Sequence, residues 1–449
     1  MDAFSSFFAV LMLSAGVFIT LRLGGFQFTH LIVALKTALR PAFGKKPGAE
    51  KAGVTPFQAM ASALGGSVGT ANIAGTAGAL ALGGPGAIFW MWVAALFGMA
   101  VKFSEIVLAL RYREKRNGEW IGGPMLYIER GLGAMRRSPA ARRLSGPLAR
   151  SFALFALLAS LIGTPLVQAN TVAESALSTV AAFGGCTAVV KPAAAPLLAA
   201  LVGIVVLGGA KRIGRISELL VPFMALAYIL VSLVVLVHFR RNIGPALLSI
   251  LRGAFGARQA AGGICAYSLV AALRVGTARG VYSNEAGVGS SPMAHACAET
   301  DDPVGQGLFG IFEVFADTLV MCTLTALCVL SSGVPLSGSG AGIALSAFSS
   351  VLGVRAAGVF LAVSLLLFAY TSIIGWSAYG LQAVVYLFGK GAKLPFCLLF
   401  TALTALGVFL RSEAVWKAGE TLNYLMAAPN MLAVLLLSGE VKKETRLSG

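Results

Sequence analysis

Long apolar segments recur along this sequence from one end to the other. Most contain about 17 to 25 residues, which as a helix is enough to cross the roughly 30 Å hydrocarbon core of a bilayer at about 1.5 Å per residue. Of the 449 residues, 57% are hydrophobic and 12% are charged, whereas charged residues make up about 25% of an average soluble domain. We therefore expect an all-α integral membrane protein.

Eleven membrane-spanning helices are predicted from these segments. In order along the chain they cover residues 4–21, 57–82, 86–110, 151–179, 196–209, 216–238, 262–292, 307–331, 356–388, 394–410 and 422–437. The connections are short apart from two basic segments, 22–56 and 111–150. Nothing in the sequence indicates a separate soluble domain, so we expect a single membrane domain over residues 1–449.

The formal net charge of +17 would suggest a nucleic-acid ligand in a soluble protein, but its distribution favours a membrane explanation. If the connections alternate between the two sides, one side holds 24 of the 35 Lys and Arg residues and the other holds 8. Cytoplasmic loops of membrane proteins carry such an excess. We expect a multi-pass cell-membrane protein with its N-terminus outside and its C-terminus in the cytoplasm, with lipids and no nucleic acid as partners.

No catalytic or metal-binding pattern accompanies the apolar segments. The six cysteines have neither paired nor metal-ligand spacing, and the three histidines lie far apart without nearby ligand sets. Ser283, next to Asn284 and Glu285, has no histidine at a workable spacing for nucleophilic catalysis. The sequence therefore predicts free thiols and no enzyme activity.

Two predicted helices contain runs of Gly, Ser, Thr and Asn where a bilayer favours Leu. One run covers residues 65–76 in the second helix, and the other covers residues 274–291 in the seventh. The two runs lie five helices apart in chain order, in the second and the seventh, so the helices after the first divide into two sets of five with opposite orientation. Interrupted helices at corresponding places in an inverted repeat point to a midplane binding site. Close packing of helices through glycine is the alternative explanation for either run.

An interrupted helix suits a zwitterion, a solute that carries one positive and one negative charge. A half-helix N-terminus offers N–H groups to a carboxylate, and freed carbonyls ligate a cation. In the first run the glycines permit close backbone approach, and Thr70 and Asn72 add side-chain oxygen atoms. A zwitterion has no net charge, so it needs a co-ion to be driven by the membrane potential, which is worth about 2.3 kcal/mol per charge at about 100 mV.

Several short motifs follow one another over nearly the whole chain. They are Gly24-Gly25-Phe26-Gln27-Phe28, Gly83-Gly84-Pro85-Gly86-Ala87, Phe89-Trp90-Met91-Trp92, Gly122-Gly123-Pro124-Met125, Gln168-Ala169-Asn170, Arg279-Gly280, Ser283-Asn284-Glu285-Ala286-Gly287, Gly375-Trp376-Ser377 and Pro429-Asn430. In these motifs the sequence resembles the alanine or glycine:cation symporter family, also called sodium:alanine symporters. That family is similar to the leucine-transporter fold, which implies a five-plus-five inverted repeat with one extra N-terminal helix. The implied parts are residues 1–55 for the extra helix and its cytoplasmic loop, 56–238 for the first repeat and 262–438 for the second.

The resemblance implies a secondary active transporter that imports a small neutral amino acid, alanine or glycine, coupled to Na+ by alternating access. The residues implied for the amino acid are Thr70, Asn72, Gly75, Thr76, Gln168, Asn284 and Trp376, with Trp376 as an apolar wall that limits side-chain size. The residues implied for Na+ are Gly69, Asn72, Thr371 and Ser372. One position departs from the family pattern, because Leu381 stands where the family has Glu. This departure leaves the ion stoichiometry open.

Several alternatives stay open at this point. H+ is the alternative coupling ion, and an ion channel is the alternative function, although the sequence lacks repeated filter residues. Gln168 and Asn170 also fit structural hydrogen bonds between helices, and Trp376 also fits a lipid-facing position. The sequence does not distinguish alanine from glycine or serine, or an L from a D enantiomer. It is compatible with a monomer but does not fix the oligomeric state.

Charged residues inside the predicted helices need partners, because a carboxylate at the centre of a bilayer costs about 2.5 to 3.5 kcal/mol. For Asp317 we expect pairing with Arg274 or Arg279 in preference to ion binding. Lys102 and Glu105, three residues apart on one helix face, are expected to pair with each other. Glu285 is expected to anchor the second interruption by accepting backbone N–H groups.

Overall fold

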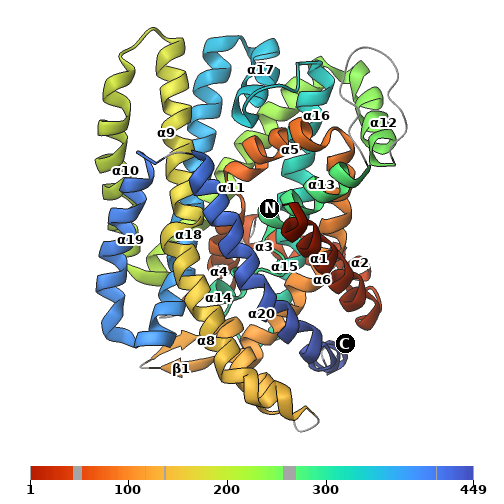
Figure 1. Ribbon diagram of the computed structural model, residues 1–449, viewed down its shortest axis with the longest axis vertical. Helices are drawn as coiled ribbons and strands as arrows, with labels where there is room; N and C mark the ends of the chain where they lie inside the picture. Colours follow the sequence, from red (N-terminus) through yellow and green to blue (C-terminus); the bar gives the residue numbers. More distant parts are fainter. Residues whose placement is uncertain are drawn as a thin grey trace.

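The computed structural model describes residues 2–43, 53–116, 118–135, 138–255, 269–410 and 412–447, and within these ranges it is almost entirely helical (Figure 1). The start of the seventh predicted helix, residues 262–268, lies outside the described residues. The one sheet in the described ranges is a two-stranded hairpin. The expectation of a mainly helical protein is confirmed, with this hairpin as the exception.

The first part of the chain forms helices and the hairpin. It comprises α1 (Asp2–Arg22), α2 (Phe26–Thr29), α3 (Leu31–Phe43), α4 (Pro56–Ser67), the π-helical turn η1 (Ala71–Gly75), α5 (Thr76–Gly83), α6 (Gly86–Tyr112), β1 (Glu114–Arg116), β2 (Glu119–Ile121), α7 (Pro124–Leu126), the π-helical turn η2 (Tyr127–Leu132), α8 (Pro139–Ile162), α9 (Thr164–Ala182), the 3-10 turn η3 (Thr187–Val189), α10 (Val190–Val206) and α11 (Gly209–His238).

The remaining elements are helical. They are the 3-10 turn η4 (Arg240–Asn242), α12 (Ile243–Ala254), α13 (Leu269–Asn284), α14 (Ser291–His295), α15 (Pro303–Val314), the π-helical segment η5 (Phe315–Cys322), α16 (Thr323–Ser332), α17 (Gly340–Leu352), α18 (Val354–Phe388), the 3-10 turn η6 (Lys390–Ala392), α19 (Lys393–Gly407) and α20 (Ser412–Leu447).

Within the described residues, seven helical segments are long and apolar enough to cross a bilayer. They are Gly86–Tyr112, Pro139–Ala181, Thr187–Val206, Gly209–His238, Pro303–Ser332, Val354–Phe388 and Val415–Leu447. Two further predicted helices, 57–82 and the described part of 262–292, are each divided into shorter pieces. These two are the helices in which the sequence predicts interruptions.

The surface of α11 is suited to lipid. Leu219, Phe223, Leu226, Leu230 and Val237 are between 54% and 73% exposed. Their spacing of three, four or seven residues places them on one face of the helix. A large exposed apolar face of this kind is unfavourable in water and favourable against acyl chains.

Local sequence explains where the helices begin and bend. Thr55 and Gln58 form a capping box at the start of α4, where the Gln58 N–H donates to Thr55 Oγ1 at 3.1 Å. Gly163, with φ −97° and ψ −115°, separates α8 from α9 within the fourth predicted helix. Pro165 follows as the second residue of α9, where its missing N–H is tolerated.

The β1–β2 hairpin lies at the end of the bundle opposite α12 and α17 (Figure 1). Gly118, with φ +81°, provides the turn between the strands. Arg113 packs its guanidinium 3.8 Å from the centre of the Trp120 ring, which strengthens the hairpin. An alternation of three residues is too short to be recognised as a strand within a basic loop, so the sequence did not predict it.

Candidate functional site

The first interruption lies between α4 and η1, and two side chains hold it open. Asn72 Oδ1 accepts a hydrogen bond from the Gly69 N–H at 2.9 Å. The next amide, Thr70 N–H, donates to Gln168 Oε1 on α9 at 3.3 Å. In a continuous helix these N–H groups would bond to carbonyls four residues earlier, so the side chains of Asn72 and Gln168 replace helical hydrogen bonds.

The carbonyls released at this interruption face α18. The Gly65 carbonyl has lost its usual partner, because the Gly69 N–H is bonded to a side chain. The Ser372 hydroxyl lies 3.1 Å from Gly65 O and 3.4 Å from Val68 O, as their donor. A hydroxyl carries one proton, so it can satisfy only one of these two carbonyls at a time.

Glycine is required where these elements touch. A Cβ on Gly375 of α18 would lie 2.7 Å from the Gly66 Cα, closer than real Cβ atoms approach. A Cβ on Gly69 would lie 2.6 Å from Ser372 Oγ and 2.7 Å from Gln168 Nε2. The glycines of the first run therefore bring the backbone of the interruption directly against α18 and α9.

Two threonines near the first interruption differ in their bonding. The hydroxyl of Thr70 is buried and has no hydrogen-bond partner among the described residues. Thr76 Oγ1 donates to the Ala71 carbonyl at 3.4 Å. A buried hydroxyl without a partner is unfavourable, so Thr70 is available to a bound solute.

The second interruption follows α13. Glu285, Gly287 and Gly289 have φ angles of +57°, +85° and +85°, which end the helix before α14 begins. Asn284 Oδ1 accepts a hydrogen bond from the Ala286 N–H at 3.0 Å. Both predicted interruptions are therefore present, and each is stabilised by an asparagine.

Two charged residues on α6 satisfy the backbone at the second interruption. The Lys102 ammonium donates to the Asn284 carbonyl at 2.8 Å, and Glu105 Oε2 accepts the Gly287 N–H at 3.2 Å. Lys102 forms its ion pair with Glu313, at 3.1 Å. The expected pairing of Lys102 with Glu105 is therefore wrong, because the Lys102 ammonium contacts Asn284 O and Glu313, while the Glu105 carboxylate accepts from the Gly287 N–H and from Asn430.

Asp317 on η5 connects the two interruptions. Its carboxylate accepts hydrogen bonds from Asn72 Nδ2 at 2.7 Å and from Ser283 Oγ at 2.8 Å. Thr318 donates to the same carboxylate at 2.8 Å and accepts from Asn284 Nδ2 at 3.1 Å. Asn72 and Asn284, one from each interruption, are thereby joined through two adjacent residues.

Arg279 does not serve Asp317. It pairs with Glu420 on α20 at 3.2 Å, and its guanidinium lies 5.4 Å from the centre of the Trp416 ring. The expected pairing of Asp317 with Arg279 is wrong, because neutral donors on η1, on α13 and on η5 itself meet the carboxylate instead.

Trp376 is fully buried on α18 and contacts the second interruption. Its indole N–H donates to Glu285 Oε1 at 2.8 Å, and Ser290 donates to Glu285 Oε2 at 2.5 Å. Glu285 therefore anchors the interruption through side-chain donors, whereas the sequence predicted backbone N–H groups. The ring of Trp376 lies 5.4 Å from that of Tyr379 at an angle of 68°.

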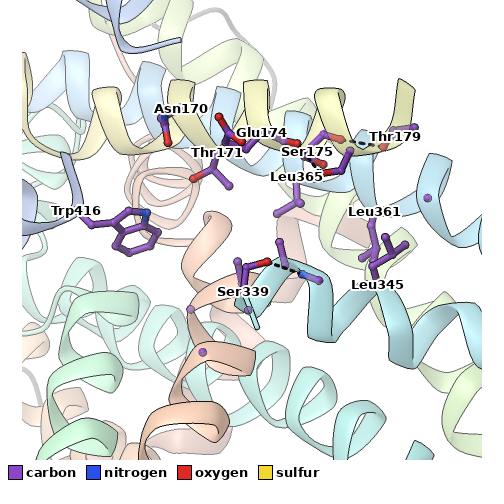
Figure 2. Close-up of a pocket in the computed structure, with 18 of the residues that line it drawn as sticks. Asn170, Thr171, Glu174, Ser175, Thr179, Ser339, Leu345, Leu361, Leu365 and Trp416 are labelled. Atoms are coloured by element: carbon purple, nitrogen blue, oxygen red, sulfur yellow. Dashed lines mark hydrogen bonds between the residues drawn. The ribbon is translucent and has the colours of Figure 1, made fainter. Parts of the chain in front are cut away.

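A cavity of about 510 Å³ opens beside the first interruption, between α9 and the start of α17 (Figure 2). Gly75 lines it, and Asn170 Oδ1, which has no partner in the described part of the chain, belongs to a lining residue. Polar residues on one face of α9 form a wall of the cavity: Asn170, Thr171, Glu174, Ser175, Ser178 and Thr179. Ser339 faces them from the start of α17 (Figure 2).

A second cavity, of about 550 Å³, lies farther along α18 beside the hairpin. Leu365 lines the first cavity and Ala378 lines the second, which puts the two linings about 20 Å apart along α18 at about 1.5 Å per residue. Ser372 and Trp376 lie between them and are fully buried. The residues of α18 that contact the two interruptions therefore lie between the cavity at α9 and α17 and the cavity at the hairpin.

The structure groups five of the ten residues that the resemblance implied for substrate and ion. Gly69, Thr70, Asn72, Gln168 and Ser372 lie together at the first interruption. Thr371, next to Ser372, instead donates to carbonyls of its own helix at 3.0 and 3.1 Å. We did not predict the carbonyls of Gly65 and Val68 from the sequence. The signal was the spacing of Asn72 three residues after Gly69, because an asparagine there can bind the Gly69 N–H and so free the Gly65 carbonyl.

Comparison with known proteins decides the family. The sequence pattern of the family described as "Sodium:alanine symporter family" matches residues 2–447. The chain belongs to the sodium:alanine symporter family. Members of this family are transporters and not enzymes, and they are multi-pass membrane proteins that bind amino acids.

Relatives within the family match over nearly their whole length. The "Sodium/alanine symporter AgcS" of Methanococcus maripaludis is 40% identical over 446 residues, which are 97% of this chain and 93% of AgcS. The "Probable sodium/glutamine symporter GlnT" of Bacillus subtilis is 37% identical over 438 residues, 97% of this chain and 86% of GlnT. Two relatives of similar identity are thus described with different amino-acid substrates, alanine and glutamine.

The fold is shared with a solved transporter structure. The crystal structure of MhsT in complex with L-phenylalanine superposes with a TM-score of 0.57 and 13% sequence identity, covering 88% of this chain and 90% of MhsT. At this identity the likeness concerns the fold alone, which is the leucine-transporter fold implied by the sequence motifs.

Proposed function

We propose that this protein imports a small neutral amino acid, alanine or glycine, together with Na+ by alternating access. Membership of the family and the description of AgcS as a sodium/alanine symporter support this proposal. The observation that carries it is the first interruption, where the Gly65 and Val68 carbonyls face a single hydroxyl, that of Ser372.

Na+ is a cargo of this cycle, and the chemistry of the first interruption fits it. Hard monovalent cations prefer oxygen ligands, and carbonyls released from a half-helix provide them. When Na+ binds, the Ser372 hydroxyl rotates its proton away and offers a lone pair beside Gly65 O and Val68 O. We assign the ion to these oxygens together with the residues expected from the sequence, Gly69, Asn72 and Thr371.

The amino acid binds next to the ion in this proposal. Thr70 contributes a buried hydroxyl without a partner in the described residues, and it adjoins the Gln168 amide. The other residues assigned to the substrate are Asn72, Gly75, Thr76, Asn284 and Trp376. Trp376 is fully buried between the two cavities, where its ring limits the length of the substrate side chain.

Alternating access requires a barrier that can open toward either side. The buried layer of α18 between Leu365 and Ala378 separates the two cavities. We propose that the cavity at α9 and α17 leads outside, and that the cavity at the hairpin leads to the cytoplasm. The excess of Lys and Arg on the hairpin side of the connections supports this orientation, with the N-terminus outside and the C-terminus cytoplasmic.

We further propose eleven membrane helices arranged as one extra N-terminal helix and a five-plus-five inverted repeat. The extra helix and its loop cover residues 1–55, and the repeats cover residues 56–238 and 262–438. Helix α4 with α5 opens the first repeat, and α13 with α14 opens the second. The interruption at the same place in each repeat supports this division.

Uptake into proteoliposomes tests the proposal. Purified protein is reconstituted, and uptake of labelled alanine is measured under an inward Na+ gradient, an inward H+ gradient and a K+ gradient of equal size. We expect saturable accumulation that depends on Na+ and that unlabelled glycine competes away. Accumulation driven by H+ alone would replace Na+ by H+ as the coupling ion, and uptake that is indifferent to all three gradients would refute coupled transport.

A further inference from the structure

The two interruptions differ in the groups that satisfy their free carbonyls. At the first interruption, a single neutral hydroxyl, that of Ser372, is shared between Gly65 O and Val68 O, and its one proton satisfies one of them at a time. At the second, Asn284 O at the end of α13 accepts a hydrogen bond from the Lys102 ammonium at 2.8 Å. A neutral hydroxyl thus faces the free carbonyls of one interruption, and a lysine side chain faces the free carbonyl of the other.

The Lys102 ammonium has the environment of a bound cation. Its side chain is completely buried, with Asn284 O at 2.8 Å and Glu313 Oε2 at 3.1 Å. Glu313 is itself held by His295 Nε2 at 2.6 Å and by Ser291 Oγ at 2.9 Å. The C-terminal end of a helix carries partial negative charge, so a cation at the end of α13 is favourable.

This cation is attached to a helix that packs closely on α13. A Cβ on Gly280 of α13 would lie 3.3 Å from the Met91 Cα on α6, and one on Gly276 would lie 2.8 Å from Trp90 Cβ. Glu105, one turn after Lys102, also binds the backbone beyond α13 through the Gly287 N–H. Helices α6 and α13 are therefore joined by close backbone packing and by both charged side chains, which holds the ammonium against the end of α13.

We propose that Lys102 is a tethered cation that takes, at the second interruption, the place that a transported Na+ takes at the first. Each cycle therefore couples one amino acid to one Na+, bound at the first interruption, with no Na+ site at the second. A fixed positive charge beside Asn284 O repels a second cation, and Glu313 is already neutralised by Lys102. This inference rests on the proposed function, and it adds the ion stoichiometry that the sequence leaves open.

The test first measures how many Na+ ions the wild-type protein couples to each alanine, and then replaces Lys102. In proteoliposomes, the dependence of alanine uptake on Na+ concentration gives a Hill coefficient, and the reversal potential gives the charge moved per alanine. We expect a wild-type Hill coefficient of about one and a single charge per alanine. A Hill coefficient of about two, or two charges per alanine, would overturn the inference.

Variants at Lys102 separate an ionic role from a structural one. Lys102→Ala leaves Asn284 O and the Glu313 carboxylate facing vacated space, so we expect a second Na+ to bind there. The Hill coefficient should then rise toward about two, and the half-saturating Na+ concentration should increase about tenfold. Lys102→Arg keeps the cation and should retain the wild-type Hill coefficient. The double variant Lys102→Ala with Glu313→Gln removes both charges, so the second Na+ should not bind and the Hill coefficient should stay near one.

The outcomes distinguish this inference from the proposed function on which it rests. Wild-type uptake without any Na+ dependence would refute the proposed function. Na+-dependent uptake by Lys102→Ala with unchanged Hill coefficient and half-saturation would refute only the role of Lys102. If Lys102→Ala does not fold, the charge moved per alanine by the wild-type protein decides the stoichiometry alone.

Discussion

Replacing Ser372 by Ala tests the ion site at the first interruption. The substitution removes the hydroxyl that donates to Gly65 O at 3.1 Å and to Val68 O at 3.4 Å. In the Na+-free state this loses one neutral hydrogen bond, worth about 1 kcal/mol, and in the Na+-bound state it loses a contact with a full charge, worth about 1.5 to 3 kcal/mol. The difference, about 0.5 to 2 kcal/mol, weakens Na+ binding about 2- to 30-fold.

The assay is the Na+ concentration that gives half-maximal alanine uptake by Ser372→Ala in proteoliposomes. Ser377→Ala is the matched control, because Ser377 is also buried on α18 but donates to the Ile374 carbonyl of its own helix at 2.6 Å. We expect the half-saturating concentration to rise for Ser372→Ala and to stay at the wild-type value for Ser377→Ala. Equal values for both variants, with uptake retained, would refute a Na+ site at Ser372.

Three further substitutions test other parts of the site. Trp376→Leu should widen the substrate range toward larger aliphatic amino acids in a counterflow assay, and an unchanged range would place Trp376 outside the pocket. Gly375→Ala should lower the free energy of unfolding by about 1 to 3 kcal/mol, because its Cβ would lie 2.7 Å from a backbone atom of α4. Gly358→Ala on the same helix is the control, because a Cβ there meets nothing within 4 Å. Equal melting temperatures for the two variants would contradict the close packing. Asp317→Asn should reduce alanine uptake about tenfold or more, because it weakens charged hydrogen bonds worth about 1.5 to 3 kcal/mol each. Glu420→Gln, which removes the partner of Arg279, should have a smaller effect, and a larger effect of Glu420→Gln would contradict the role given to Asp317.

The interruptions could be predicted from the sequence because their causes are local. Glycine runs lower the cost of leaving the helical conformation, and Asn72 and Asn284 have side chains that can replace helical partners a few residues away. The structure confirms breaks at residues 68–70 and 285–290, inside the two predicted runs. Long apolar segments likewise predict membrane helices, because length and composition suffice to identify them.

The partners of the buried charges could not be predicted in the same way. Lys102 and Glu105 are three residues apart, yet each serves a different atom at the second interruption. Asp317 meets Asn72 from a segment 245 residues away in the chain. Pairings across such separations depend on how helices pack, and a single sequence contains no direct record of that packing.

The central claim is that carbonyls freed at the first interruption hold the Na+ that drives amino-acid uptake. A structure determined at high resolution in the presence of Na+ and alanine tests it most directly. We predict density for an ion in contact with Gly65 O, Val68 O and the Ser372 hydroxyl, with alanine beside Thr70. A continuous helix through residues 67–70, or bound alanine with no ion at these oxygens, would contradict the claim.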